Sequence, residues 1–435
     1  MAKKIYIGLL LAVFGGIVLH APFSVAFSAL LPNNDLLIKS WKEILLGLAL
    51  LLLPIILTKY KKWGILKEPL FICIAAFGLF NVLLVPFFYT GTEATLAGIL
   101  INLRYLLFFV LVYVALKTFP EYTKLFVKVF IAGALVVLVF AILQLTVLPN
   151  DFLKYLGYGP STIMPYLTVD QNVQFIRINS TLRGPNPLGA YAMVVLTLVL
   201  AFWLKSRHKL VKKEQIILAI LAAGSVLAIW ASYSRSAVIG VVVAAVIVLF
   251  VAKGKTLSKG LLIALAAAVL VCTGSLVAFK DTSFVSNVIL HEDPAEGNDV
   301  NSNDGHLESL QDGTKRVLMQ PFGGGIGSTG SASLLTNSPL IIENNYLFVA
   351  HESGWLGLGL FVAIIGILLT KLWRGRKNWF VLGVFASGIA LVLIGLIQPV
   401  WVDETVSIVW WGLAAIALVR TRGSAILLED NDNKK

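Results

Sequence analysis

Residues 94–116 read ATLAGILINLRYLLFFVLVYVAL, an apolar stretch that contains a single charged residue, Arg104. A run of about 20 apolar residues is long enough to cross a lipid bilayer as a helix. The chain of 435 residues is similar throughout, with 58% hydrophobic and 13% charged residues and a mean hydropathy of +0.87. This composition excludes a soluble domain. It predicts an all-α integral membrane protein, because each span must satisfy its own backbone hydrogen bonds in lipid.

Further apolar stretches of about this length recur along the chain. Together with 94–116 they predict about twelve transmembrane helices. They are expected at residues 5–30, 41–58, 69–88, 94–116, 125–148, 187–204, 214–232, 235–252, 260–279, 353–370, 378–398 and 403–419. We expect residues 1–435 to form a single polytopic membrane domain. Cys73 and Cys272 both fall inside predicted spans, so no disulfide framework is expected.

Lysine and arginine concentrate in alternate loops, for example in 59–67, 205–213 and 371–377. Positively charged loops are retained in the cytoplasm, so both termini are predicted to be cytoplasmic. The formal net charge of +12 therefore reflects topology and does not indicate nucleic-acid binding. Two segments on the outer side, at about 149–186 and 280–342, are unusually long, and long loops are often functional.

The second long loop has two parts. Residues 291–313 are acidic and rich in glycine and asparagine, which predicts a poorly ordered segment. The next stretch, QPFGGGIGSTG at 320–330, has enough glycine to let the backbone approach a ligand closely. It lacks the Gly-Lys-Ser/Thr sequence of a P-loop.

Membrane topology explains the basic residues in the cytoplasmic loops, but it does not explain those on the outer side or inside a span. Arg104 lies about ten residues into its span, roughly 15 Å along a helix, where a charge must face protein, water or an anion. Arg177 and Arg183 lie in RINSTLRGPNPLGAY, before the sixth span, and Arg235 lies at the short turn in WASYSRSAVIG. Plain structural interpretations remain open: ion pairing for Arg104, snorkelling to lipid headgroups for Arg235, and solvation for the two loop arginines.

Three motifs follow one another along the chain: RGPNPLGAY, SYSRSAVIGVVV, and QPFGGGIGSTG followed by ENNYLFVAHESGWLGLGLF. Together they resemble the O-antigen ligase and O-antigen polymerase superfamily of bacterial membrane glycosyltransferases, over about 177–365. The resemblance implies transfer of a glycan from a polyprenyl diphosphate carrier to a glycan, lipid or protein hydroxyl. It places this reaction at the outer face of the cytoplasmic membrane. It also implies that Arg183 and Arg235 bind the donor diphosphate.

Glu343 stands where ligases of this family usually have the proposed catalytic histidine. This departure favours a repeat-unit polymerase over a ligase. A carboxylate can take a proton from an acceptor hydroxyl as an imidazole does. An acid in the first turn of a helix starting near Ile342 would also be favoured by the helix dipole alone, so a structural interpretation of Glu343 stays open.

The predicted site combines a general base with several cations. Glu343 and Arg235 are the predicted catalytic residues. The residues predicted to bind substrate are Arg104, Arg177, Arg183, Arg316, Asn344, Tyr346 and His306. No metal or other cofactor is expected, because arginine holds phosphate oxygens bidentately and the outer loops contain no Asp-x-Asp metal signature. We expect Arg104, Arg183 and Arg235 to converge on one outward-facing cavity, since none has an acidic neighbour in its own motif.

The alternative function is a secondary transporter, because twelve spans with both termini inside is a common transporter layout. Transporters of this kind often show sequence symmetry between halves and a pair of broken helices near the bilayer midplane. Neither feature is visible in this sequence. The outer clustering of polar residues also favours the transferase.

Overall fold

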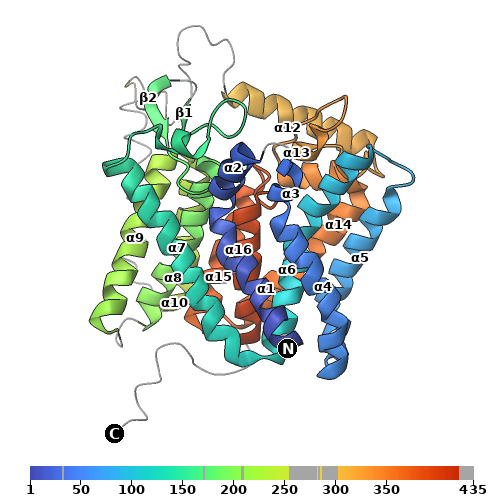
Figure 1. Cartoon of the computed structure of the whole chain (residues 1–435), viewed down its shortest axis with the longest axis horizontal. Helices are drawn as coiled ribbons and strands as arrows, with labels where there is room; N and C mark the ends of the chain where they lie inside the picture. Colours follow the sequence, from blue (N-terminus) through green and yellow to red (C-terminus); the bar gives the residue numbers. More distant parts are fainter. Residues whose placement is uncertain are drawn as a thin grey trace.

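The computed structural model describes residues 1–31, 34–169, 172–206, 210–253, 282, 285–286 and 302–420. Within these ranges the regular structure is almost entirely helical. Most of the helices run along a common direction and form a bundle (Figure 1). This architecture fits the predicted all-α membrane class.

Among the described residues, eight helical segments are long and apolar enough to cross a membrane. They are Ala2–Leu30, made of α1 (Ala2–Gly16), η1 (Ile17–Leu19) and α2 (His20–Leu30); α4 (Trp41–Lys59); α6 (Thr92–Thr118); Pro120–Thr146, made of η4 (Pro120–Tyr122) and α7 (Thr123–Thr146); α8 (Pro185–Ser206); α9 (Lys212–Ser232); α10 (Arg235–Lys253); and α14 (Asn345–Arg374).

Other predicted spans correspond to shorter helices, namely α5 (Pro69–Leu84), α15 (Trp379–Ile394) and α16 (Glu404–Arg420). The predicted span at 260–279 lies outside the described residues. The count of twelve spans and the cytoplasmic position of both termini therefore stay predictions.

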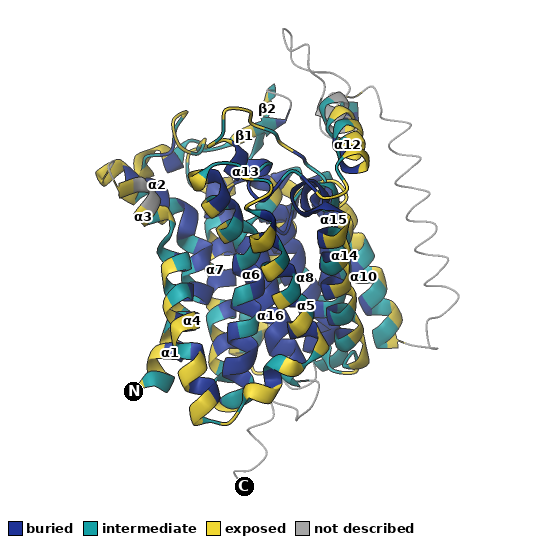
Figure 2. Ribbon diagram, turned by 90° about the vertical axis from the view of Figure 1, so that its right-hand side faces the viewer, coloured by how far each residue is buried: buried dark blue, intermediate teal, exposed yellow. Residues whose placement is uncertain are grey.

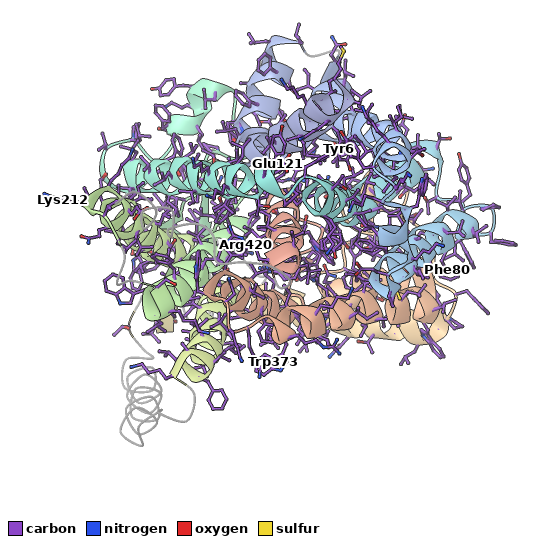
Figure 3. All side chains as sticks on the ribbon, turned by 90° about the horizontal axis from the view of Figure 1, so that it is seen from below. Tyr6, Phe80, Glu121, Lys212, Trp373 and Arg420 are labelled. Atoms are coloured by element: carbon purple, nitrogen blue, oxygen red, sulfur yellow. The ribbon has the colours of Figure 1, made fainter. Side chains whose placement is uncertain are left out.

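Helix α16 occupies the centre of the bundle. Its residues from Thr405 to Leu418 are all buried, and α1, α6, α7, α8 and α15 pack around it. Figure 2 shows the buried residues concentrated on the central helices and the exposed ones at the periphery. In the view from below, the end of α16 at Arg420 is surrounded by other helices (Figure 3). A helix that is apolar on all sides is expected in such a buried position.

The strands and helices of the two long predicted loops that the structure describes lie at the end of the bundle opposite Met1 (Figure 1). The first contains η5 (Phe152–Leu156) and an antiparallel pair of strands, β1 (Leu167–Val169) and β2 (Asn172–Arg177). The second contains α12 (Ser302–Met319) and α13 (Gly330–Ser333). Two short helices complete the described structure, α3 (Asp35–Lys39) and η3 (Trp63–Lys67).

The prediction of a poorly ordered segment at 291–313 is wrong for its second half, which belongs to α12. This helix packs on α14: a Cβ added to Gly313 would lie 3.2 Å from Leu347. The indole nitrogen of Trp355 donates a hydrogen bond to the carbonyl of Val317 at 2.9 Å. Contacts with another helix therefore stabilise a segment that has few apolar side chains of its own. The part before α12 lies outside the described residues.

A break in helix α14 is closed by the glycine-rich segment 320–330. Gly354 has φ 64° and ψ −170°, a conformation that interrupts the helical hydrogen bonding. The carbonyl of Glu352 accepts instead from the backbone N–H of Gly325 at 3.1 Å. The glycine-rich segment thus supplies donors that the broken helix lacks.

The carboxylate of Glu352 also anchors this segment. Its Oε1 accepts from the backbone N–H of Gly327 at 2.9 Å, and its Oε2 accepts from the side-chain amide of Asn102 on α6. Gly327 has φ 85°, and a Cβ added there would lie 2.2 Å from the carbonyl oxygen of Ala94. The close backbone approach expected for these glycines is therefore made to α6 of the protein itself.

We expect Gly327→Ala to lower the free energy of unfolding by about 2 kcal/mol or more, because the added Cβ requires an unfavourable φ and collides with α6. Thermal unfolding of the purified protein in detergent would measure the effect. Gly359→Ala in α14 is the matched control, since a Cβ added at Gly359 would have no atom within 4 Å. Alanine favours a helix, so this control should be unchanged or slightly more stable. Equal stability of the two variants would contradict the described packing.

Candidate functional site

A cavity of about 930 Å³ is lined by residues from both long loops and from α2, α4, α6, α8 and α10. Its volume suits a ligand of moderate size. Its charged lining residues are Lys39, Lys42, Glu43, Arg104, Arg177, Arg183, Arg235, Glu343, Asp403 and Glu404. The structure therefore brings Arg104, Arg183 and Arg235 to one cavity, together with Arg177 and Glu343.

One wall of the cavity contains an ion network of five almost fully buried side chains, those of His20, Lys42, Glu43, Arg104 and Glu404. Lys42 Nζ lies 2.9 Å from Glu404 Oε2 and 3.3 Å from Glu43 Oε2. Arg104 Nη1 lies 3.2 Å from Glu43 Oε1 and 3.4 Å from Glu404 Oε2. The two cations and two carboxylates balance one another, which is what buried charges require.

Arg104 has no acidic neighbour in its own motif, but the fold brings acidic partners to it from elsewhere in the chain. Its partners come from other helices, Glu43 from α4 and Glu404 from α16. Its Nη2 also donates to the carbonyl oxygen of Val402 at 2.9 Å. Arg104 therefore holds the cavity wall together, as in the ion-pairing interpretation. A direct contact with substrate stays a prediction.

His20 extends the network to α2. The indole N–H of Trp41 donates to Nδ1 of His20 at 2.9 Å. The other ring nitrogen, Nε2, lies 2.9 Å from Glu404 Oε1 and 3.2 Å from Lys42 Nζ. His20 therefore links α2 to the carboxylate of Glu404.

The arginines on the other side of the cavity differ in how they are held. Arg177 Nε donates to the carbonyl of Ser232 at 2.8 Å, and its Nη2 donates to Asn186 Oδ1 at 2.6 Å. Arg177 therefore supports the turn between α9 and α10 as well as lining the cavity. Arg183 is exposed and lines the cavity. Its side chain makes no hydrogen bond or ion pair with the described part of the chain. Its guanidinium is available to a ligand.

Arg235 is the first residue of α10, and the first turn of that helix contains no acidic residue. A positive side chain at a helix N-terminus opposes the helix dipole, which favours anions there. An anion in the cavity would interact favourably with both the guanidinium and the helix end. The position of Arg235 therefore points to anion binding more than to helix stability.

Glu343 lines the cavity just before α14 begins. That helix starts at Asn345, and Asn344 is its N-cap, with Oδ1 accepting from the backbone N–H of Tyr346 and Leu347 at 2.9 and 3.0 Å. The structural interpretation of Glu343 as a first-turn acid is therefore wrong, since Glu343 precedes the cap.

Three other predicted site residues are not part of the cavity lining. Asn344 Nδ2 and Tyr346 Oη each donate at 2.8 Å to backbone carbonyls in α15 or just after it. Arg316 Nε donates to Asp312 Oδ2, one turn earlier on α12, at 2.6 Å. These contacts stabilise the fold. The side chain of His306 lies outside the described residues.

Asp403 is a cavity residue that was not predicted from the sequence. Its Oδ1 accepts from the backbone N–H of Val406 at 2.8 Å, which caps α16. The other carboxylate oxygen of Asp403 makes no hydrogen bond or ion pair with the described part of the chain. The sequence feature that could have identified Asp403 is the pair of adjacent acids, Asp403 and Glu404, at the start of an apolar span.

Residues 217–362 match the family model described as O-Antigen ligase. The match confirms the predicted resemblance to the O-antigen ligase and polymerase superfamily and indicates glycan transfer in a membrane. It takes in most of α9, all of α10, α12 and α13, and the first part of α14, and it includes Arg235 and Glu343. No curated protein matches the chain.

We expect Arg104→Gln to lower the free energy of unfolding by about 3 kcal/mol or more, because it leaves buried carboxylates without a cation. The double variant Arg104→Gln, Glu43→Gln should recover much of this loss, since it removes one of the unpaired acids. Thermal unfolding in detergent would measure both. Arg183→Gln is the control and should be neutral. A double variant no more stable than Arg104→Gln alone would contradict the pairing.

Proposed function

We propose that this chain, whose residues 217–362 match the O-antigen ligase family, is an inverting glycosyltransferase that moves a glycan from a polyprenyl diphosphate to a hydroxyl acceptor. The observation that carries the proposal is one cavity that contains both cations and carboxylates outside the ion network. The cations are Lys39, Arg177, Arg183 and Arg235. Of the two carboxylates, Glu343 and Asp403, we assign Glu343 as the base.

The charge of the cavity supports an anionic donor. Lys42 and Arg104 are balanced by Glu43 and Glu404 within the ion network. The remaining arginines gather around the start of α8 and α10, where Arg235 adds to the field of a helix N-terminus. Guanidinium groups hold phosphate oxygens bidentately and keep their charge. A diphosphate matches this arrangement.

The lining also supports a donor carried by lipid. Leu100, Ile239 and Ile397 line the same cavity as the arginines, although their side chains are 42%, 52% and 46% exposed. Leu100 and Ile239 belong to α6 and α10, helices long and apolar enough to span a membrane. A polyprenyl chain could contact these side chains while its diphosphate reaches the arginines. We place the reaction at the outer face of the cytoplasmic membrane, as the charge distribution of the loops predicts.

In the proposed reaction the acceptor oxygen attacks the anomeric carbon from the face opposite the diphosphate. The bond between that carbon and the diphosphate oxygen breaks, and its electron pair leaves with the diphosphate. Glu343 takes the proton from the acceptor hydroxyl, and Arg183 and Arg235 stabilise the charge on the leaving group. Because Glu343 replaces the histidine usual in ligases, we favour polymerisation of repeat units over ligation.

The reaction itself is tested with purified protein in lipid vesicles and a synthetic polyprenyl diphosphate oligosaccharide. We expect wild-type protein to convert it to longer lipid-linked oligosaccharides and free polyprenyl diphosphate. Transfer to a different hydroxyl acceptor, without lengthening, would indicate ligation instead. No donor consumption with any acceptor would contradict the proposed function.

We expect Glu343→Gln to lower turnover by about 100- to 10,000-fold with little change in donor affinity, because the amide keeps the shape but cannot accept the proton. Donor consumption and donor binding are measured on the same preparation. Asp403→Asn is the matched comparison, since Asp403 is a second carboxylate in the cavity. A large loss in Asp403→Asn with near-normal turnover in Glu343→Gln would assign the base to Asp403.

We expect Arg183→Ala and Arg235→Ala each to lower kcat/KM by about 10- to 100-fold, because a charge-assisted contact with the diphosphate is lost. Both donor affinity and turnover should fall, since the contact exists in the ground state and strengthens in the transition state. Arg316→Ala is the control, because Arg316 pairs with Asp312 away from the cavity lining. A loss of similar size in Arg316→Ala would contradict the placement of the donor.

A further inference from the structure

Tyr233 adopts a backbone conformation that a bulky side chain rarely takes. It lies at the turn between α9 and α10, with φ 45° and ψ 33°, in the left-handed region. There the Cβ of an L-residue is crowded against its own backbone, so glycine is the residue usually found. Strained positions of this kind persist only where the surroundings enforce them, and they cluster at functional sites.

The surroundings of this turn do enforce its shape. The carbonyl of Ser232 accepts from Arg177 Nε at 2.8 Å. The carbonyl of Ala231 accepts from the backbone N–H of Ile178 at 3.2 Å. Arg177, at the end of β2, and Ile178 therefore fix the two carbonyl groups that precede Tyr233. The chain must then turn sharply at Tyr233 to begin α10.

The strained turn places Tyr233 in the lining of the cavity that Arg235 and Arg183 also line. The ring of Phe175 packs against that of Tyr233 edge to face, with centroids 6.4 Å apart and planes at 83°. Trp230 lies at the same centroid distance, 6.4 Å, with planes at 52°. These aromatic neighbours fix the orientation of the Tyr233 ring.

The hydroxyl of Tyr233 keeps its proton at neutral pH. Partial burial raises the pKa of this phenol above its ordinary value, because the protein solvates the phenolate less well than water does. The side chain therefore carries an aromatic ring and a protonated hydroxyl at the cavity. Sugars present complementary groups, since the ring C–H groups of a pyranose pack on aromatic faces and its hydroxyls accept hydrogen bonds.

We propose that Tyr233 is the binding platform for the pyranose ring attached directly to the donor diphosphate. A glycine would form the same turn without backbone strain. A tyrosine at this position is therefore unfavourable for the turn, and a role of its ring in the cavity explains why it is present. The sugar next to the diphosphate must lie within reach of the residues that flank Arg235. This assignment rests on the proposed function and adds the residue that recognises the sugar.

The test compares two lipid probes that differ only in the sugar: farnesyl diphosphate, and farnesyl diphosphate carrying N-acetylglucosamine on its terminal phosphate. Their affinities for the full-length protein in detergent are measured by equilibrium binding. For wild-type protein we expect the sugar to improve affinity by about three- to tenfold, as expected for one aromatic contact and one hydrogen bond. In Tyr233→Gly this gain should disappear, while farnesyl diphosphate binds as before.

Two further variants separate a sugar contact from a structural role. Tyr233→Phe keeps the ring and should retain most of the gain. Lys61→Gly is the matched control, since Lys61 also has a left-handed backbone, φ 53°, but does not line the cavity. It should leave both affinities unchanged. Tyr233→Gly should not lower the melting temperature, because relief of backbone strain offsets the lost ring contacts.

Each outcome decides between the proposals. The same sugar gain in Tyr233→Gly and wild type, or no gain in wild type, would overturn the role of Tyr233 while leaving the proposed function intact. Loss of affinity for both probes in Tyr233→Gly would show that the residue is structural, and would overturn the role in the same way. No binding of either probe to wild-type protein would overturn the proposed function, and the role of Tyr233 with it.

Discussion

The ion pairs that Arg104 makes with Glu43 and Glu404 hold together three helices, α6, α4 and α16. Buried charges are tolerated only when they are paired, so these helices can pack closely only in the register that brings the charges together. His20 adds α2 to the same cluster. The wall of the cavity is therefore fixed by electrostatics, although it is set among apolar helices that could otherwise slide along one another.

The membrane class and most helix positions follow from local hydrophobicity. The span expected at 94–116 corresponds to α6, Thr92–Thr118. The span expected at 353–370 is longer in the structure, since α14 begins at Asn345. The residues before Gly354 are helical because they pack on α12 and the glycine-rich segment, and hydropathy does not report such contacts. Helix α12 was missed for the same reason, since its stability comes from α14.

The candidate site could be predicted where a residue is unusual in its own sequence context. Arg183 and Arg235 stand out as outer positive charges next to turns, and both line the cavity. The acidic partners of Arg104 could not be assigned in this way, because a partner such as Glu43 is 61 residues away. Asn344 was predicted as part of the same motif as Glu343. Capping of α14 directs its side chain to the backbone instead, which requires knowing where the helix starts.

The helix end at Arg235 has a consequence for the cycle of the proposed reaction. Breaking the bond to the sugar leaves the polyprenyl diphosphate with one more negative charge than the donor had. The guanidinium groups and the N-terminus of α10 attract this product at least as strongly as they attract the donor. Such a site would bind the polyprenyl diphosphate product tightly. If the proposed reaction is correct, we expect release of polyprenyl diphosphate to be slower than the chemical step, and we expect free polyprenyl diphosphate to compete with the donor.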